Sequence, residues 1–230
     1  MNNTAPSDRS TKRAEEPGLS WANIARSSLK QFLPESVLRE VRRYRSCEGV
    51  KLPLYLYSKI SLALGLPSRK SMRGIKPRSV LFVCFGNIMR SPMCEHLMNR
   101  ALGSTALRIR VTSAGLNAVA GREAHPWAIA AARNFDISLE NHRARLLTPA
   151  MVSSADLIFA MDLQNYAQLI ARFPQARKQI YMLGAFKGPD ADGMEIRDPY
   201  DDGPEATFQC YRILLTCIHN LSQDLIANSR

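Results

Sequence analysis

From residue 79 onward, short runs rich in Val, Ile, Leu and Phe alternate with longer stretches in which apolar residues recur every three or four positions. The short runs are typical of buried strands and the longer stretches of helices, because the two elements repeat their side-chain directions at different periods. The predicted strands are 79–83, 109–112, 157–161 and 179–183, and the predicted helices are 92–102, 127–134, 148–153, 164–173 and 204–226. This alternation predicts an α/β fold with a four-stranded parallel sheet and helices on both faces.

The first 78 residues follow another pattern. Residues 1–18 are polar and mixed in charge, which predicts a disordered tail. Apolar residues then recur at helical spacing among Arg and Lys, which predicts two basic amphipathic helices broken near Pro34. The apolar stretch 52–66 has only 15 residues, fewer than the roughly 20 needed to span a bilayer. We therefore expect a basic helical extension and linker over 19–78 and an α/β domain over 79–230, with the boundary at 67–78.

Positive charge is concentrated in this extension. Residues 1–79 hold 16 basic and 6 acidic residues, a net charge of +10 within the +11 of the whole 230-residue chain. Basic amphipathic helices are common on anionic membranes and also as solvated or partly packed extensions. For residues 19–78 a solvated or partly packed extension is the favoured interpretation, and contact with an anionic membrane surface or an acidic partner is the hypothesis kept beside it. No nucleic-acid motif is present, so no nucleic-acid partner is expected.

The number of cysteines indicates the redox environment of the protein. Five cysteines are too few, and odd in number, for a disulfide framework in a chain of this length. The first thirty residues also lack the apolar core of a secretory signal. We therefore expect a cytoplasmic protein, at the membrane periphery if the extension binds lipid.

Candidate chemistry begins at Cys84, directly after the first predicted strand. Its loop Cys-Phe-Gly-Asn-Ile-Met-Arg-Ser leads into a helix that begins near Ser91, so the loop lies at a helix N-terminus. Free backbone N–H groups and the helix dipole bind anions there and favour a thiolate. Arg90 adds a planar fork of donors for phosphoryl oxygens. The loop therefore predicts a nucleophile, Cys84, and a phosphate clamp, Arg90, with substrate contacts from Phe85, Gly86, Asn87, Ile88, Met89 and Ser91.

The spacing of Cys84 and Arg90 alone is weak evidence, since short motifs recur by chance. Cys94 and Arg100 have the same spacing, but the residues between them include no glycine and follow no strand. We interpret Cys94 as a residue that packs inside its helix.

A leaving phenolate must be protonated, so a carboxylic acid is expected from another part of the chain. Asp198 is the best candidate, because Pro199 stiffens its loop and Tyr200 could form an aromatic wall for the substrate ring. The alternative for Asp-Pro-Tyr is an ordinary turn before the last helix.

Residues 79–225 resemble the low-molecular-weight protein tyrosine phosphatases. The resemblance rests on VLFVCFGNIMRSPMCEHL, the Ser-Ala-Gly at 113–115, the Asn-His-Arg-Ala-Arg at 141–145, ADLIFAMD at 155–162 and the Asp-Pro-Tyr at 198–200. It implies a phosphocysteine at Cys84, with Asp198 as acid and then base, and no metal or other cofactor. It also implies that Asn87 is held in a strained conformation by Ser113 and His142, and that Ser91 stabilises the thiolate. Without this resemblance, we would interpret Ser113 as a turn residue at the end of a strand and His142 as a residue of a surface loop.

Two positions depart from the family. Many members have a second cysteine where this chain has Met89, and that cysteine can form a reversible disulfide with the nucleophile. Without it, over-oxidation of Cys84 should be easier unless a thiol such as Cys94 reaches it. Asp201 stands where many relatives have a tyrosine.

Two alternatives remain beside the phosphatase. A thiol-dependent arsenate reductase would need further cysteines, for which Cys210 and Cys217 lie on one helix face, although buried cysteines of a core helix are the simpler interpretation. The other alternative is a phosphotyrosine-binding or membrane-surface adaptor without catalysis.

Overall fold

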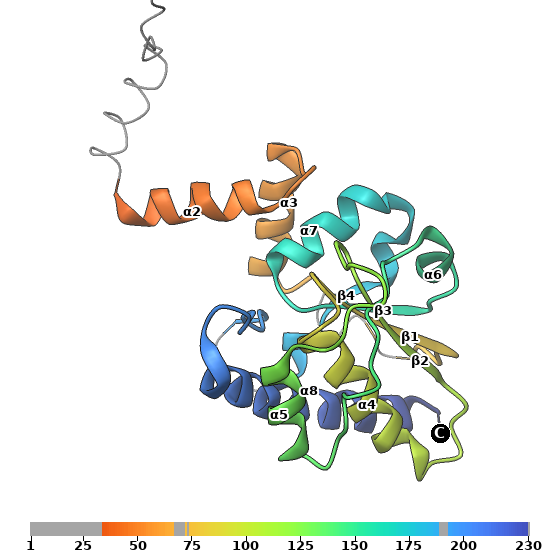
Figure 1. Ribbon diagram of the computed structural model, residues 1–230. Coiled ribbons are helices and arrows are strands. Elements are labelled where there is room, and N and C mark those ends of the chain that lie inside the picture. The colour runs from red at the N-terminus through yellow and green to blue at the C-terminus, as the bar shows by residue number, and fades with distance from the viewer. Residues whose placement is uncertain (1–33, 67–71, 73, 189–192, 230) are drawn as a thin grey trace, which may run out of the picture. The chain divides into compact units, whose positions relative to one another are not determined.

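Four parallel strands lie at the centre of the domain, as the alternation of apolar runs predicts (Figure 1). The strands are β1 (Ser79–Cys84), β2 (Arg110–Gly115), β3 (Leu157–Ala160) and β4 (Ile180–Met182). Their order in the sheet is β2-β1-β3-β4, and every neighbouring pair is parallel. Strand β1 therefore lies between β2 and β3, and its carboxyl end is next to the carboxyl ends of both of these strands.

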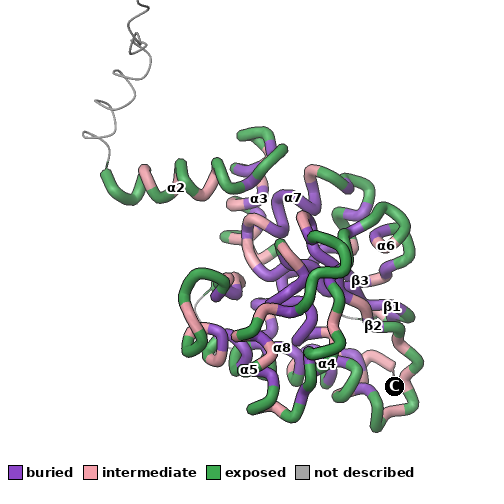
Figure 2. Tube along the Cα trace, viewed as in Figure 1, coloured by how far each residue is buried: buried purple, intermediate pink, exposed green. Residues whose placement is uncertain are grey.

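Helices cover both faces of the sheet, which confirms the predicted fold class. Along β1, Val80 and Phe82 belong to one hydrophobic cluster, while Leu81 and Val83 belong to the other. The strands at the centre of the domain are mostly buried (Figure 2). The first cluster is covered by α4 (Arg90–Gly103), α5 (Pro126–Arg133) and α8 (Gly203–Ser229), and the second by α6 (Pro149–Ser153) and α7 (Leu163–Arg172). All six residues of β1 are buried, as expected for a central strand of a parallel sheet.

Local sequence sets the helix starts on the second face. The Thr148 hydroxyl accepts a hydrogen bond of 3.3 Å from Met151 N at the start of α6, and Asp162 caps α7 by accepting one of 2.8 Å from Asn165 N. Two short 3₁₀ helices, η2 (Pro174–Gln179) and η3 (Leu183–Phe186), flank β4.

The computed structural model describes residues 34–66, 72, 74–188 and 193–229. The predicted tail 1–18 and the first predicted helix of the extension lie outside these residues. Contacts divide the chain into two units, 1–42 and 43–230. In the first, the described residues form the beginning of α2 (Glu35–Ser46), which the helical spacing predicts, and Arg42 pairs with Glu35 on its surface.

The second unit includes part of the predicted extension. Helix α3 (Leu52–Ala63) forms from the apolar stretch before the linker, and Tyr55 is buried in a cluster with Leu163 and Ala167 of α7. The packing of α3 therefore crosses the boundary predicted at 67–78, because the linker joins two segments that share a core. In the part of the chain that the structure describes, no helix is long and apolar enough to cross a membrane.

Candidate active site

Cys84 is the last residue of β1, and the loop after it ends where α4 begins at Arg90. Its Sγ lies 3.3 Å from Asn87 N, which donates to it, and 3.0 Å from Ser91 Oγ. A Cβ on Gly115 would lie 2.7 Å from Phe85 O and 2.8 Å from Asn87 N, so this position on β2 must be glycine for the loop to pass. The thiol therefore accepts a backbone hydrogen bond and lies beside a hydroxyl group at a helix N-terminus.

Asn87 has the left-handed conformation, with φ of 52°, which is uncommon for a residue with a side chain. Its Nδ2 donates to Ser91 Oγ and Ser113 Oγ, each at 2.9 Å, and its Oδ1 accepts from Arg145 N at 2.8 Å. His142 Nε2 lies 2.7 Å from the Asn87 carbonyl oxygen. These bonds stabilise the conformation of the loop, and burial lowers the pKa of His142, which favours its neutral ring.

Two further residues complete this network. Glu95 Oε2 accepts a hydrogen bond of 2.6 Å from Ser113 Oγ and forms an ion pair with Arg145. The sequence interpretation assigned a role to neither residue. Glu95 stands four positions after Ser91 and so lies on the same face of α4. This spacing was the feature of the sequence that could have indicated its role beside the loop.

Arg90 is buried, with 1% of its side chain exposed. Its Nη1 donates to Asp162 Oδ2 at 2.6 Å and to Ile196 O at 2.8 Å, and its Nη2 pairs with Asp198. Burial opposes the charge, but the carboxylates of Asp162 and Asp198 outweigh it and raise the pKa of the guanidinium. Arg90 Nε has no acceptor among the described residues, so this donor is available to an oxygen of a bound oxyanion.

The sequence interpretation gave Asp162 no role at the site. It is the second residue after the end of β3, at the same sheet edge as Cys84. Because parallel strands bring their carboxyl ends together, an acidic residue at this place was a usable signal.

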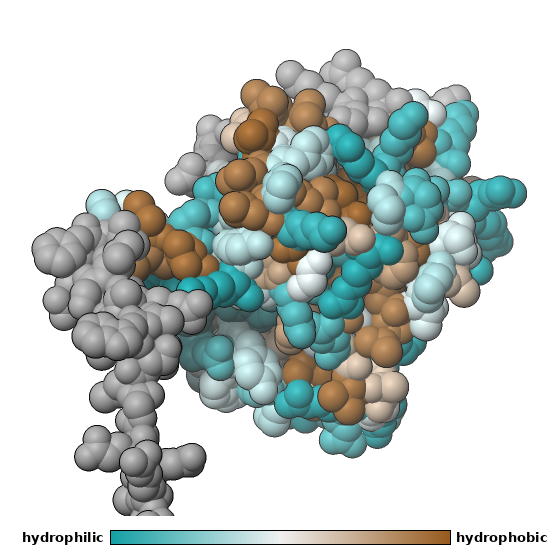
Figure 3. Space-filling model, turned by 90° about the horizontal axis from the view of Figure 1, so that it is seen from above, coloured by the Kyte–Doolittle hydropathy of each residue, from teal (hydrophilic) through white to brown (hydrophobic). Residues whose placement is uncertain are grey.

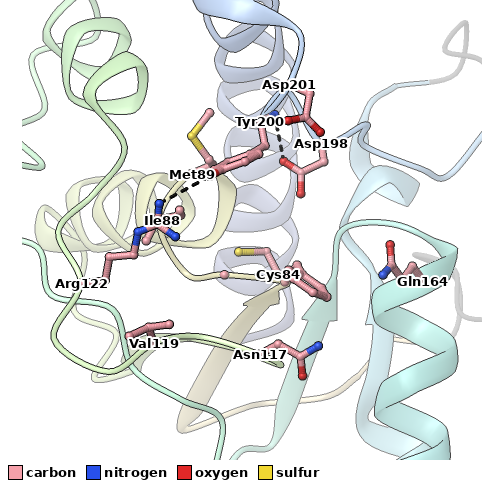
Figure 4. Close-up of a pocket in the computed structure, with 12 residues that line it drawn as sticks. Cys84, Ile88, Met89, Asn117, Val119, Arg122, Gln164, Asp198, Tyr200 and Asp201 are labelled. Carbon is pink, nitrogen blue, oxygen red and sulfur yellow. Dashed lines mark hydrogen bonds between the residues drawn. The ribbon is translucent and has the colours of Figure 1, made fainter. Parts of the chain in front are cut away.

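A pocket of about 430 Å³ opens over the loop (Figure 4). Phe85 and Tyr200 are 38% and 40% exposed and provide aromatic surface on its walls. The Asp198 carboxylate enters from the loop before α8, on the other side of the pocket from Cys84, and its Oδ1 accepts from Tyr200 N at 3.3 Å. A planar phenyl ring matches the aromatic and aliphatic walls, and its phosphate would lie over Cys84.

The structure divides the predicted site residues into two groups. Those that line the pocket are Cys84, Phe85, Gly86, Ile88, Met89, Asp198 and Tyr200. Asn87, Arg90, Ser91 and Ser113 are buried behind or beneath it, and His142 is half-buried. Of these, Asn87, Ser91, Ser113 and His142 are joined by hydrogen bonds that hold the loop. The pocket is also lined by Asn117, Val119, Arg122, Gln164 and Asp201. The loop from residue 117 to 127 was expected to contribute pocket walls, whereas Gln164 was not named, because its approach depends on tertiary packing.

The other cysteines are free thiols in the protein interior. Cys94 is fully buried inside α4, as expected of a packing residue, and burial raises its pKa well above the ordinary range. Burial also raises the pKa of Cys210 and of Cys217 to about 12. Among the residues that the structure describes, no group of three or more His, Cys, Asp or Glu side chains could hold a metal ion.

A thiol at a helix N-terminus, a buried arginine beside it and a carboxyl group across the pocket define a cysteine-dependent phosphatase site. The sequence profile of the family described as low molecular weight phosphotyrosine protein phosphatase matches residues 79–229. The chain belongs to this family, which confirms the resemblance stated above.

Individual relatives agree with this assignment. The low molecular weight protein-tyrosine-phosphatase Etp of Escherichia coli K12 is 35% identical over 143 residues, which cover 62% of this chain and 91% of Etp. The crystal structure of the tyrosine phosphatase Wzb from Escherichia coli K30 with sulphate matches with a TM-score of 0.59 and 31% identity, over 65% of this chain and 99% of Wzb. The YwlE arginine phosphatase from Geobacillus stearothermophilus matches with a TM-score of 0.58 and 31% identity, over 66% of this chain and 94% of that one.

Proposed function

We propose that this protein hydrolyses phosphotyrosine in protein substrates, with Cys84 as nucleophile, Arg90 as phosphate clamp and Asp198 as general acid and base. The observation that carries the proposal is the position of Arg90, which lies between Asp162 and Asp198 and next to the Cys84 loop. Its two anchors fix the guanidinium before substrate arrives, which reduces the reorganisation needed in the transition state.

In the first step, the Cys84 thiolate attacks phosphorus, and the bond between phosphorus and the tyrosine oxygen breaks. Protonated Asp198 gives its proton to that leaving oxygen, while Arg90 and the loop amides bind the charge on the three remaining oxygens. In the second step, Asp198 as carboxylate takes a proton from water. The water oxygen attacks phosphorus, and the bond to sulfur breaks, which releases phosphate and restores the Cys84 thiolate.

Kinetics on p-nitrophenyl phosphate and a phosphotyrosine peptide would test the roles of these residues. We expect Cys84→Ser to abolish turnover of both substrates in folded protein. Asp198→Asn should lower kcat/KM, which reports the step that releases the leaving group, about 10²- to 10⁴-fold on the peptide and less on p-nitrophenyl phosphate, whose more acidic leaving group depends less on a proton. Equal losses on both substrates would contradict the acid role of Asp198, and turnover by Cys84→Ser would contradict the whole proposal.

A substrate panel would test the class of phosphate ester. Phe85 and Tyr200 give the pocket aromatic walls, so we expect phosphotyrosine to be preferred over phosphoserine. Phosphoarginine peptides belong in the panel because a structural relative is an arginine phosphatase. A higher kcat/KM for phosphoarginine would replace the tyrosine assignment.

The two alternatives are less well supported. An arsenate reductase would have to pass a disulfide through thiols, whereas burial raises the pKa of Cys210 and of Cys217 to about 12 and makes them poor nucleophiles. Thioredoxin-dependent turnover of arsenate that is lost in Cys217→Ser would favour the reductase. A non-catalytic adaptor would leave p-nitrophenyl phosphate unchanged.

We also propose that residues 19–78 bring the enzyme to an anionic membrane surface or an acidic partner, in the reducing cytoplasm. The net charge of this part of the sequence supports the proposal. Co-sedimentation of the full chain with anionic vesicles, compared with a chain that lacks residues 1–42, tests whether the first unit contributes.

A further inference from the structure

Helix α3 has apolar residues on its outer face as well as on the face that packs against the domain. Its fully buried residues are Tyr55, Ser58 and Ser61, which face the domain. A row of large aliphatic side chains points outward instead, with exposed fractions of 49% for Leu52, 49% for Leu56, 59% for Ile60 and 68% for Leu64. These residues repeat every four positions, so they form one continuous stripe along the helix.

The inner face explains why the helix is oriented in this way. Ser58 and Ser61 are small enough to let α3 approach α7 closely, and Ser58 Oγ donates to Leu54 O at 2.9 Å within its own helix. Tyr55 fills the cluster with Leu163 and Ala167. Rotating the helix to bury the leucines would remove these contacts, so the orientation of the stripe is fixed by the packing of the second unit.

The outer face continues beyond the helix. Leu66 is 54% exposed, and Pro53 and Ala63 are also exposed between the larger side chains. Figure 3 looks onto the molecule from above, the side on which α3 lies in Figure 1, and shows apolar side chains gathered on this surface. An apolar surface of this extent needs a partner, since isolated exposed leucines are common but continuous rows of them are not.

The charge of the sequence that contains and follows α3 points to the partner. Between Gly49 and Ser79 the sequence contains seven Lys or Arg and no Asp or Glu. Lys51 and Lys59 lie at and within the helix, and the other five follow it between residues 69 and 78. Aliphatic side chains beside such a basic segment are complementary to a bilayer with anionic headgroups, whose acyl boundary takes up the leucines.

The length and composition of α3 are consistent with a position in the membrane surface. Twelve residues of helix extend about 18 Å, too short to cross the hydrocarbon core. A protein interface would instead be expected to present aromatic or arginine anchors at its centre, whereas the centre of this stripe is Leu56 and Ile60. We propose that the outer face of α3, Leu52 to Leu66, inserts into the interface of an anionic lipid bilayer. This inference rests on the proposed contact of residues 19–78 with an anionic surface, and it names the element and the partner.

Co-sedimentation of the full chain with vesicles tests the inference. We expect binding to phosphatidylcholine vesicles that contain phosphatidylserine, weaker binding to phosphatidylcholine alone, and weaker binding at high salt. The double variant Leu56→Gln/Ile60→Gln should lower the partition coefficient at least about tenfold, because it removes the two central apolar side chains. A matched double variant, Leu146→Gln/Leu215→Gln, changes exposed leucines outside α3 and should bind like the unchanged chain.

Each of the other possible outcomes contradicts one part of the proposal. If the unchanged chain does not bind mixed vesicles, both the membrane contact and the α3 face are wrong. If it binds and the Leu56/Ile60 variant binds equally, the basic segment binds lipid without this face. A dimer in light scattering that the same variant dissociates, without vesicle binding, would make the stripe an interface between copies. Hydrolysis of p-nitrophenyl phosphate by every variant keeps these outcomes separate from the catalytic proposal.

Discussion

Arg90 Nη1 donates a hydrogen bond of 2.6 Å to Oδ2 of Asp162, whose other oxygen caps helix α7. One carboxylate therefore joins the second face of the sheet to the phosphate clamp of the site. The two Nη atoms of Arg90 are bonded to Asp162, Asp198 and Ile196 O. The guanidinium is therefore fixed in place and cannot move to meet a phosphate that binds in another position. Asp162 does not line the pocket, so we infer that it acts by positioning Arg90.

The variant Asp162→Asn removes the charge but keeps an oxygen that can cap α7. We expect kcat for p-nitrophenyl phosphate to fall about tenfold to a hundredfold, because a small misplacement of Arg90 weakens its contact with the transition state. Tm should also fall, since a buried guanidinium loses part of its compensation. Steady-state kinetics and thermal unfolding measure the two effects.

A matched control is Asp156→Asn. Asp156 Oδ2 accepts from Arg78 N at 2.8 Å and from Ser79 N at 3.0 Å, at the end of β1 that is far from Cys84. This variant should lower Tm with kcat unchanged. If Asp162→Asn also leaves kcat unchanged, the pairing with Arg90 is structural only.

The fold was predictable from the sequence, whereas several residues that hold the catalytic loop and Arg90 in place were not. Strands such as 79–83 are continuous apolar runs between breakers, so their period and length specify a buried parallel sheet. The Cys84 loop was predictable because its chemistry is local to one strand and one helix. The sequence did not reveal the pairing of Glu95 with Arg145, because the two residues are 50 positions apart. It did not reveal the pairing of Asp162 with Arg90 either, because that pairing depends on which strands are neighbours in the sheet. The packing of α3 was missed because apolar residues occur all round this helix, so their spacing does not specify which face is buried.

Met89 replaces the thiol that many relatives have beside the arginine, and the structure offers no good substitute. Burial raises the pKa of Cys94 well above its ordinary range, so it forms little thiolate to attack an oxidised Cys84. After peroxide treatment we expect Cys84 to carry two or three added oxygens by mass spectrometry, with activity that dithiothreitol does not restore. Met89→Cys should form a disulfide with Cys84, and dithiothreitol should restore its activity.

Cys94→Ala is the control for this prediction. It should behave as the unchanged chain, because Cys94 takes no part in the oxidation. Full recovery of the unchanged chain with dithiothreitol, lost in Cys94→Ala, would show that Cys94 resolves the oxidised nucleophile.

His142 gives the domain a pH dependence that can be isolated. Burial lowers its pKa, so the unfolded chain takes up a proton more readily than the folded protein. The stabilisation is present above the unfolded pKa of about 6.5 and is lost as pH falls through the lower folded value. Thermal unfolding between about pH 7.5 and pH 5 should show a steeper fall in Tm for the unchanged chain than for His142→Gln.

Glutamine is chosen because its Nε2 can still donate to the Asn87 carbonyl oxygen, which His142 Nε2 contacts at 2.7 Å. Near pH 7.5 the two proteins should therefore have similar Tm and kcat. Parallel Tm curves over the whole range would mean that protonation of His142 does not differ between the folded and unfolded states.

Tyr55 tests whether residues 43–66 belong to the folded domain. Its side chain is 1% exposed, lies edge-on to Tyr44 with ring centroids 5.2 Å apart, and packs against Leu163 at the start of α7. Tyr55→Ala would leave a cavity and should cost about 3 kcal/mol. For a domain of this size that corresponds to a fall in Tm of about 6–12 °C, measurable by calorimetry.

Leu56→Ala is the natural comparison, because Leu56 is the next residue of α3 but is 49% exposed on the outer face. Its truncation should change stability by no more than about 0.5 kcal/mol. Tyr55 packs against α7, whose first turn includes Gln164 of the pocket wall. Gln164 Nε2 also donates a hydrogen bond of 2.7 Å to Ser46 O. Loss of the Tyr55 contacts should therefore also raise KM for a phosphotyrosine peptide. Equal melting curves for Tyr55→Ala and Leu56→Ala would instead make residues 43–66 an appendage that folds apart from the phosphatase domain, with the boundary at 67–78.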